Sequence, residues 1–437
     1  MITVRRCRGS RHGVLAISAS ALLVLAACGG STSSGPGGGW ATMVPLPTGA
    51  AAGSGTHATA VVSANPGIVT ADLGQNSPTD MFIHMSSVTA PAGKVTFVVQ
   101  NDDTQTHEFV VLKTDHPAAG FPIGSFEGEQ NRIDEDTAGT NVGETGDMKG
   151  GSSKTLTIDL PPGHYAIVCN LPGHYAAGMH VDFFATPPGS TPVVAALGDT
   201  SPTEMFIHMS SPSAPAGPVS FIVSNESTDM KHELVGFQTK TAANAFPITG
   251  FEGDPNKIDE DTAGKVVLDT GADLPPGTAM MITVNLAEGH YALVCNLSGH
   301  YAAGMHVDFF ATPPGAVVDA ELGQTSDTDM FIHLSSSVAP IGSVSFVVAN
   351  DDTVTHEFVV LQTDHPAAGF PIGSFEGESN RIDEDTAGTN VGETGDMKAG
   401  TSQLLTIDMP AGHFAIVCNL PGHYAAGMHD DFWTATT

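Results

Sequence analysis

One domain-sized segment of this sequence occurs three times, and this repetition limits the fold more than any other feature. The most closely matching stretch, HYAAGMH, recurs at His174–His180, His300–His306 and His423–His429. The cysteine that precedes it, at positions 169, 295 and 418, recurs after 126 and then 123 residues. Solenoid repeats are only roughly 20–50 residues long, so a period of this size is a whole domain. Most of the 437 residues therefore form three homologous domains.

Short proline-rich joints separate the copies. The sequence TPPG stands at positions 186–189 and again at 312–315. Copies one and three share the run NRIDEDTAGTNVGETGDMK without a change, whereas the middle copy has drifted there. We predict domains at residues 66–187, 188–313 and 314–437, joined by semi-rigid linkers.

Each copy is expected to be built from strands. Fifty glycines and 29 prolines work against long helices, and short runs rich in β-branched residues are bounded by Gly, Pro or Asp. This pattern predicts an all-β fold in which each domain is an antiparallel sandwich, with a long acidic excursion and a helical turn within residues 126–148. In the first copy the expected strands are Lys94–Gln100, His107–Leu112, Lys154–Leu160, His164–Cys169 and His180–Phe184.

The first residues are typical of an export signal. Four arginines between Arg5 and Arg11 precede an apolar run, Val14–Ala27, which is too short for a comfortable membrane span. The run ends in LAACG, which resembles the bacterial lipobox and implies cleavage before Cys28 and lipid attachment to it. An ordinary cleaved signal is the alternative. We expect a signal peptide at residues 1–27 and a flexible tether at 28–65. The protein would be exported and lipid-anchored to the cell membrane or outer membrane, facing the periplasm or exterior.

The charge balance restricts the partners. Without the leader arginines, 11 basic residues stand against 47 acidic ones, a net charge of −36. Phosphate backbones and anionic lipid surfaces repel such a chain, so we expect no nucleic-acid binding and membrane contact through the lipid only. A redox partner with a basic docking surface is expected instead.

A recurring set of metal-ligating side chains indicates the chemistry. Each copy carries Cys-x4-His-x4-Met, and a further histidine stands 62 or 63 residues before the cysteine. A thiolate, two imidazoles and a weak thioether are the ligands of a mononuclear type 1 copper centre. The predicted ligand sets are His107, Cys169, His174 and Met179; His232, Cys295, His300 and Met305; and His356, Cys418, His423 and Met428.

The spacing allows one loop to supply three of the ligands. We expect Cys169 to close one strand, Met179 to open the next and His174 to lie on the loop between them. His107 is expected to come from a neighbouring strand across the sandwich. The competing interpretation is a buried apolar cysteine, a core methionine and an unrelated loop histidine.

These residues carry a family resemblance. The run YAIVCNLPGHYAAGM, together with NDDTQTHEF upstream, resembles the cupredoxins and most closely the sulfocyanin-type blue copper proteins, over residues 66–437. The resemblance implies Greek-key β-sandwiches that each hold one copper, up to three per chain, and shuttle single electrons through the loop histidine. Asn101 and Asn350 match the family's loop asparagine, whereas Asn225 is one residue further from its histidine. Glu108, Glu233 and Glu357 stand where many relatives carry Asn.

Other recurring residues leave alternatives open. A nitrite reductase or multicopper oxidase would hold a further copper between domains, on histidines such as His84, His164 or His180 and their repeats. Those enzymes place a histidine beside the copper cysteine, where this chain has Val168 and Asn170. A copper storage or delivery protein is the third alternative. The acidic runs at residues 134–136, 259–261 and 383–385 lack the later ligands of a calcium loop and indicate a solvated face.

Overall fold

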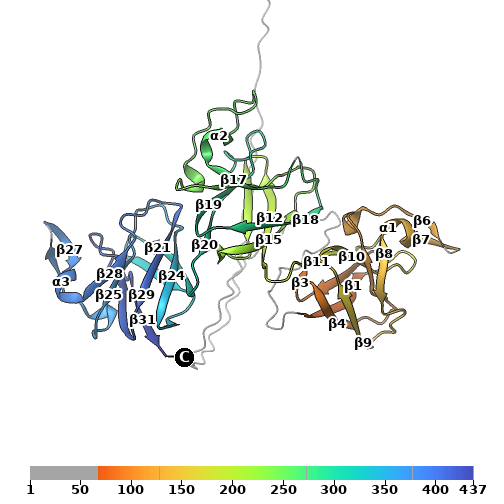
Figure 1. Cartoon of the computed structure of the whole chain (residues 1–437), viewed down its shortest axis with the longest axis horizontal. Coiled ribbons are helices and arrows are strands. Elements are labelled where there is room, and N and C mark those ends of the chain that lie inside the picture. Colours follow the sequence, from red (N-terminus) through yellow and green to blue (C-terminus); the bar gives the residue numbers. More distant parts are fainter. Residues whose placement is uncertain (1–66, 127, 272, 376, 437) are drawn as a thin grey trace, which may run out of the picture. The chain divides into compact units, whose positions relative to one another are not determined.

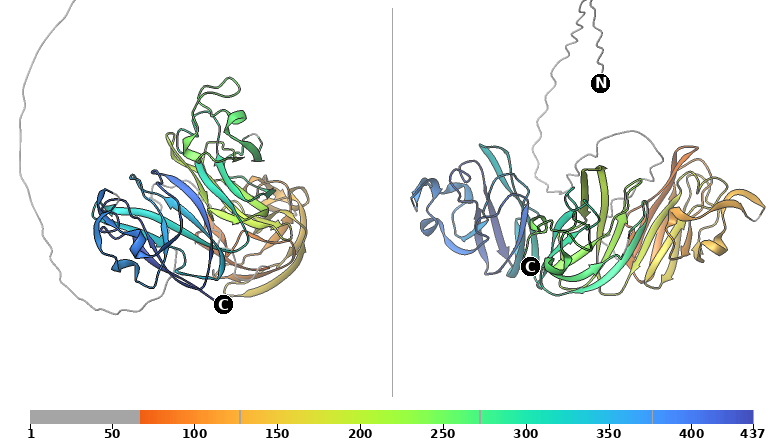
Figure 2. Two further views of the ribbon diagram at one scale, coloured as in Figure 1. Left: turned by 60° about the vertical axis from the view of Figure 1, so that its left-hand side comes forward. Right: turned by 90° about the horizontal axis from the view of Figure 1, so that it is seen from above.

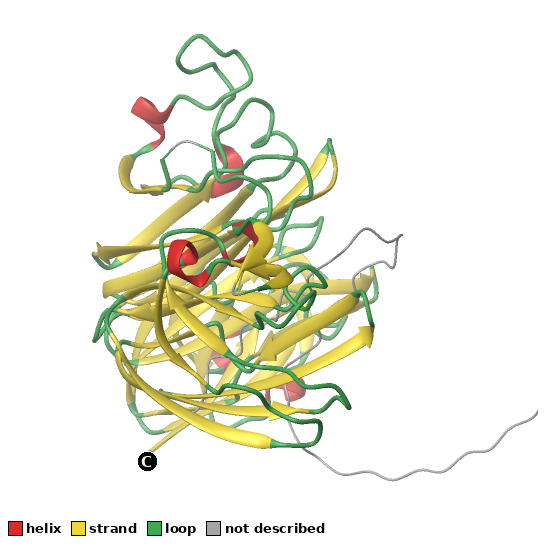
Figure 3. Ribbon diagram, turned by 90° about the vertical axis from the view of Figure 1, so that its right-hand side faces the viewer, coloured by secondary structure: helices red, strands yellow, loops and turns green. Residues whose placement is uncertain are grey.

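A computed structural model describes residues 67–436 apart from residues 127, 272 and 376 (Figure 1). The signal peptide, Cys28 and the tether predicted for residues 1–65 lie outside the described residues. Within the described part of the chain, no helix is long and apolar enough to cross a membrane. Strands and loops make up nearly all of it, and the helices are short turns (Figure 3).

The first domain consists of two sheets. One has the strand order β2-β1-β4-β9, and the other has the order β3-β11-β10-β5-β8. A separate hairpin, β6–β7, and the one-turn helix α1 lie in the excursion between β5 and β8. The bounds are β1 (Ile68–Ser77), β2 (Asp80–Met85), β3 (Thr89–Pro91), β4 (Gly93–Asn101), β5 (Val110–Lys113), β6 (Ile123–Phe126), β7 (Glu129–Ile133), α1 (Glu135–Ala138), β8 (Thr140–Glu144), β9 (Ser153–Leu160), β10 (Gly163–Val168) and β11 (His180–Thr186).

Alternating side chains place the core between the two sheets. In β4, Val95, Phe97 and Val99 are fully buried, while the residues between them are partly or fully exposed. Phe97 packs against Phe109 and Phe183, with ring centroids 5.3 and 5.2 Å apart. Cys169 and Met179 belong to the same buried cluster, so two of the predicted metal ligands are part of the core.

The other two domains repeat the two sheets, each from a continuous stretch of sequence (Figure 2). The separate hairpin recurs in the third domain, whereas the described residues of the middle domain have only isolated bridges there. The predicted boundaries fall between β11 and β12 and between β20 and β21. The second domain comprises β12 (Thr191–Ser201), β13 (Glu204–Met209), β14 (Ser213–Pro215), β15 (Gly217–Asn225), β16 (Val235–Gln238), α2 (Glu260–Ala263), β17 (Lys265–Asp269), β18 (Ala279–Leu286), β19 (Gly289–Val294) and β20 (His306–Thr312). The third comprises β21 (Ala316–Ser326), β22 (Asp329–Leu334), β23 (Val338–Pro340), β24 (Gly342–Asn350), β25 (Val359–Gln362), β26 (Ile372–Phe375), β27 (Glu378–Ile382), α3 (Glu384–Ala387), β28 (Thr389–Glu393), β29 (Thr401–Met409), β30 (Gly412–Val417) and β31 (His429–Ala435).

Two details of the predicted sandwich are wrong. The sheets are mixed, because β1 runs parallel to β4 and β3 runs parallel to β11. The strand predicted to begin at His107 begins at Val110, because the His107 backbone instead pairs with Met148 in an isolated bridge. The excursion does contain the predicted helical turn, α1.

Candidate metal centres

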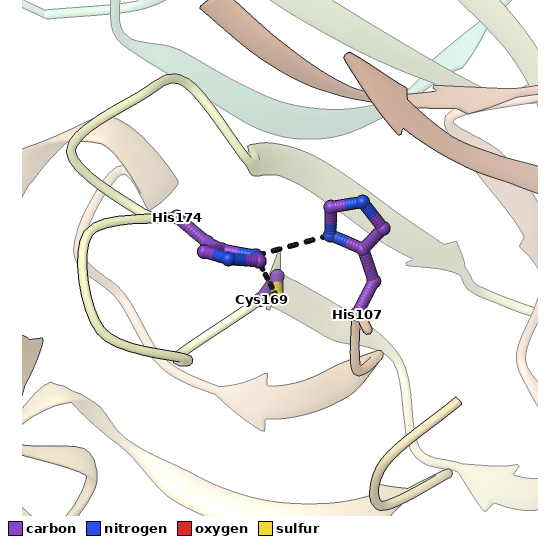
Figure 4. A group of neighbouring side chains, drawn as sticks. All are labelled: His107, Cys169 and His174. Carbon is purple, nitrogen blue, oxygen red and sulfur yellow. Dashed lines mark hydrogen bonds between the residues drawn. The ribbon is translucent and has the colours of Figure 1, made fainter. Parts of the chain in front are cut away.

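In the first domain, Cys169, His174 and His107 come together at one end of the sandwich (Figure 4). The two Nδ1 atoms of the histidines are 3.0 Å apart, and the Cys169 Sγ lies 3.4 Å from the His174 Nδ1. His107 and Cys169 are fully buried, whereas His174 is half-buried. One nitrogen or sulfur of each residue therefore faces a common point.

The other two domains reproduce this geometry. The Nδ1 atoms of the paired histidines are 3.1 Å apart in both, and each cysteine Sγ is 3.4 Å from the loop histidine Nδ1. In each of the three groups the ligand atoms lie within 4.8 Å of one another. The remaining groups are His232, Cys295 and His300, and His356, Cys418 and His423.

The donor set fits a single copper ion. Three ligand atoms at about 2.0–2.3 Å from a shared metal in a trigonal plane lie roughly 3.5–3.7 Å from one another. The His–His and Cys–loop His separations of 3.0–3.4 Å are slightly shorter than this, and all three atoms of each group lie within 4.8 Å. One thiolate and two imidazoles form the trigonal set of a type 1 centre. The chain thus has three His/Cys/His groups suited to type 1 copper.

The loop after β10 brings two of these residues together as predicted. Cys169 follows the last residue of β10, and its N–H donates to the Met179 carbonyl at 3.0 Å just before β11 begins. Gly178 has a φ of +107°, and a Cβ there would lie 2.8 Å from the Met81 carbonyl. The Met81 N–H in turn donates to the Ala177 carbonyl. The recurring MFIH segment therefore supports the ligand loop.

The structure corrects the expected position of His107 and leaves the expected role of Met179 open. His107 does not come from across the sandwich, because it precedes β5, which pairs with β10 in the same sheet. Met179 is fully buried in the same cluster as Cys169. Its role as axial ligand, like that of Met305 and Met428, stays a prediction.

Burial favours the neutral forms of Cys169 and His174 when no metal is bound. It raises the pKa of Cys169 to about 12, although the Glu108 N–H donates to the sulfur at 3.4 Å. Burial also lowers the pKa of His174, and the nearby His107 lowers it further. Metal binding must therefore displace the thiol proton into solvent, while the His174 imidazole is ready to coordinate.

A carboxylate fixes the orientation of the first histidine. The His107 Nε2–H donates to the Asp103 Oδ2 at 3.0 Å, which leaves the Nδ1 lone pair directed at the site. Burial raises the pKa of Asp103, but hydrogen bonds from His107 and the Thr104 backbone outweigh it and hold the pKa below its usual value. Asp103 is not among the residues predicted from the sequence, although the identical DDT in copy three was a signal for it.

Two residues singled out in the sequence, Asn170 and Glu108, prove to be bonded to each other beside the ligand loop. The Asn170 side chain accepts from the Ile133 N–H at 2.8 Å and donates to Oε1 of Glu135 at 2.9 Å. The acidic run is thus only partly a solvated face, because Glu135 is half-buried and bonded to the residue beside the copper cysteine. Glu108 accepts from the Asn170 N–H at 2.9 Å, and burial raises its pKa to about 7.

The remaining recurring histidines have other contacts. The His84 ring stacks on Phe82 at a centroid distance of 4.0 Å, and His208 and His333 stack in the same way in their own copies. His164 lies 2.7 Å from Asp182, with the same contact at His290 and His413. His180, His306 and His429 each lie against a loop tyrosine.

Comparison with known proteins finds one protein family whose model matches two segments of the chain. The family model described as "Sulfocyanin (SoxE) domain" matches residues 58–196 and 312–437. No curated protein matches the chain. Among solved structures, a copper-containing nitrite reductase from Thermus scotoductus is 10% identical over 85% of this chain and 98% of its own, with a TM-score of 0.26. A multicopper oxidase from Campylobacter jejuni is 10% identical over 85% and 93%, with a TM-score of 0.27. Auracyanin from Roseiflexus castenholzii is 22% identical over 29% and 100%, with a TM-score of 0.22.

Proposed function

Because the chain belongs to the sulfocyanin (SoxE) domain family, we propose that it transfers single electrons through type 1 copper, with one centre in each of its three cupredoxin domains. The observation that carries this proposal is the threefold repetition of a buried cysteine and two histidines whose ligand atoms already face one another. Copper in such a set changes oxidation state with little rearrangement of its ligands.

The surrounding residues keep the site rigid. Asp103 holds the His107 ring, the Glu108 N–H contacts the sulfur, and Asn170 ties the ligand loop to α1. A fixed donor set needs little reorganisation energy when the charge changes. His174 is the most exposed of the three grouped residues, so we assign to it the exchange of electrons with a partner.

The cellular setting belongs to the same proposal. The LAACG sequence and the following Gly/Ser-rich segment support export, lipidation at Cys28 and tethering to a membrane. The net charge, −32 for the full chain and −36 without the leader arginines, supports a partner with a basic docking surface. These features favour a carrier that meets its partners outside the cytoplasm.

Copper counting and optical spectra of the copper-loaded, oxidised chain test the function. We expect three coppers per chain and an intense absorption band in the red, with the paramagnetic signal of type 1 copper. Absence of that band would sink the proposal. A fourth copper with a different paramagnetic signal would favour an oxidase or nitrite reductase, and copper held only as Cu(I) would favour a storage protein.

Removing one thiolate tests whether the middle copy is a blue centre. Cys295→Ser should remove about one third of the red band if all three sites fill equally, because the band requires the Cu–thiolate bond. Cys169→Ser and Cys418→Ser are the matched controls, and each should remove the same share. An undiminished band in the Cys295→Ser chain would show that the middle site does not contribute.

A further inference from the structure

The outer nitrogen of the first histidine has a different partner in the middle domain than in the other two. In the first and third domains, the Nε2–H of His107 or His356 donates directly to an aspartate, Asp103 or Asp352, at 3.0 and 2.9 Å. Both histidines are fully buried, and the side chains of both aspartates are only 7% exposed. A carboxylate therefore touches the imidazole in a nearly dry environment.

In the middle domain, a serine takes the place of that aspartate. The His232 Nε2 lies 2.7 Å from the Ser227 Oγ, and this hydroxyl donates to the Asp199 carboxylate. Ser227 occupies the same backbone position as Asp103, because its N–H donates to the loop asparagine, Asn225, at 2.9 Å. The corresponding bond from Asp103 to Asn101 is 3.0 Å.

The carboxylate has moved to the neighbouring strand. Asp199 in β12 pairs with Met205, and the residue in the same register of β1 is Gln75, which pairs with Met81. The Gln75 side chain donates to Asp103 at 3.3 Å. The pair Gln75 and Asp103 is thus replaced by Asp199 and Ser227, so the carboxylate is kept but lies one hydroxyl further from the histidine.

This exchange changes the electrostatics of the ligand. A carboxylate that accepts directly from Nε2–H draws the proton away, makes the imidazole a stronger donor and adds a nearby negative charge. Both effects stabilise Cu(II) more than Cu(I), and both weaken when a neutral hydroxyl intervenes and the charge is further away. The tautomer is the same in all three domains, so coordination through Nδ1 is preserved.

We infer that the three centres are electronically unequal, and that the centre of the middle domain has the highest reduction potential. Asp103 and Asp352 are positioning residues that lower the potential of the outer centres by acting through His107 and His356. At equilibrium the first electron taken up by the oxidised chain then resides at the centre of Cys295. This inference rests on the proposed function.

Chains that keep one blue centre test the order of potentials. Cys169→Ser with Cys418→Ser leaves the middle centre, and the corresponding pairs leave the first or third. Each copper-loaded full-length chain is titrated with the ferricyanide/ferrocyanide couple, following the red band. We expect the first and third centres to agree, and the middle centre to favour Cu(I) by about tenfold more, which is 59 mV for one electron.

Reciprocal exchanges test the cause. In the chain that keeps only the first centre, the double substitution Gln75→Asp and Asp103→Ser copies the middle domain and should raise the potential. In the chain that keeps only the middle centre, the reverse substitution, Asp199→Gln with Ser227→Asp, should lower the potential. Asp103→Asn keeps an acceptor without the charge and should also raise it. Asp102→Asn, at an exposed neighbour, removes the same charge without touching His107 and is the control. Pulsed paramagnetic resonance should show a changed coupling of the remote histidine nitrogen only where its partner changes.

The outcomes separate the two proposals. Single-centre chains without a red band would defeat the proposed function, and this inference with it. Bands of normal intensity with three equal potentials would overturn the inference alone. If an exchanged chain fails to fold, the three single-centre chains with native surroundings still decide the order. Equal shifts from Asp102→Asn and Asp103→Asn would overturn the role of the hydrogen bond.

Discussion

The glutamate after the first histidine of each site is an unusual neighbour for a metal-ligating thiol. Glu108 is 9% exposed, and burial raises its pKa to about 7, with the same value at Glu233 and Glu357. Each accepts a hydrogen bond from the N–H that follows the copper cysteine. A neutral glutamate is therefore preferred in the metal-free fold, and its ionisation works against folding.

This raised pKa predicts a pH dependence of stability. An acid with a raised folded-state pKa contributes stability that is complete below pH 4.5 and is lost as the pH rises through about 7. Replacing Glu108, Glu233 and Glu357 by Gln should stabilise the metal-free chain relative to the parent by about 1–3 kcal/mol per domain at pH 8, and by little at pH 4.5. Denaturant unfolding at fixed pH measures the difference. Glu204→Gln, at an exposed position, should show no such trend; a pH-independent difference for the triple variant would contradict the prediction.

The protonated thiols predict proton release on metal binding. Burial raises the pKa of Cys169, Cys295 and Cys418 to about 12, so each thiol loses its proton only when metal binds. Zn²⁺ takes the same nitrogen and sulfur donors without redox chemistry. Its binding at pH 8.5 should release about one proton per site, measured by pH-stat titration. Cys418→Ser should release one proton fewer, and uptake without proton release would show that the thiols are not ligands.

At the scale of elements, the loop that carries two ligands is held by the excursion before β8. Asn170 connects them: its side chain accepts from the Ile133 N–H and donates to the Ile133 carbonyl and to Glu135 of α1. Asn296 and Asn419 make the same three bonds in their domains. The segment before β8 therefore packs against the ligand loop and is hydrogen-bonded to it through Asn170.

Removing this connection should loosen the loop. Asn170→Ala leaves the buried Ile133 backbone groups without partners, which costs about 1–3 kcal/mol of unfolding free energy for that domain. Hydrogen exchange should accelerate in residues 169–179, where the ligand loop lies. Asn76→Ala, at an exposed position that also makes a side-chain hydrogen bond, is the control. Unchanged exchange in this loop would show that other contacts are sufficient to hold it.

The strands and ligand sets differ in how far sequence could predict them. Alternating β-branched residues located β4, β9, β10 and β11 to within two residues at each end, because local pattern decides those strands. The pattern does not encode which strands pair, so the parallel β1–β4 pair was missed. The ligand residues could be predicted because the same Cys, His and Met spacing recurs in all three copies. Asp103 could not be predicted, because in the sequence an acidic loop residue cannot be distinguished from a surface acid. Only the fold places it beside His107.

At the scale of the whole molecule, the net charge of −32 predicts how small oxidants react. The rate with a cationic cobalt(III) phenanthroline complex should fall as ionic strength rises, because salt screens its attraction to the acidic chain. The rate with ferricyanide, an anion, should rise over the same range and serves as the control. Both rates are measured by stopped-flow absorbance, starting from the chain with its copper reduced to Cu(I). Equal salt dependence for the two oxidants would show that the net charge does not steer encounter.

The first strand pairs in the same register in all three copies, and this has a consequence for how the chain folds. β1 pairs with β4 so that Leu73 faces Asn101, and the same register recurs between β12 and β15 and between β21 and β24. The first strand of one copy therefore has the register to pair in the sheet of another copy, and such an exchange of identical elements is domain swapping. Domains generally fold one after another during synthesis, the N-terminal one first, so an earlier domain can close on itself before a later one exists. In a denatured chain all three first strands are present at once, so refolding offers each sheet a wrong strand that sequential synthesis would withhold.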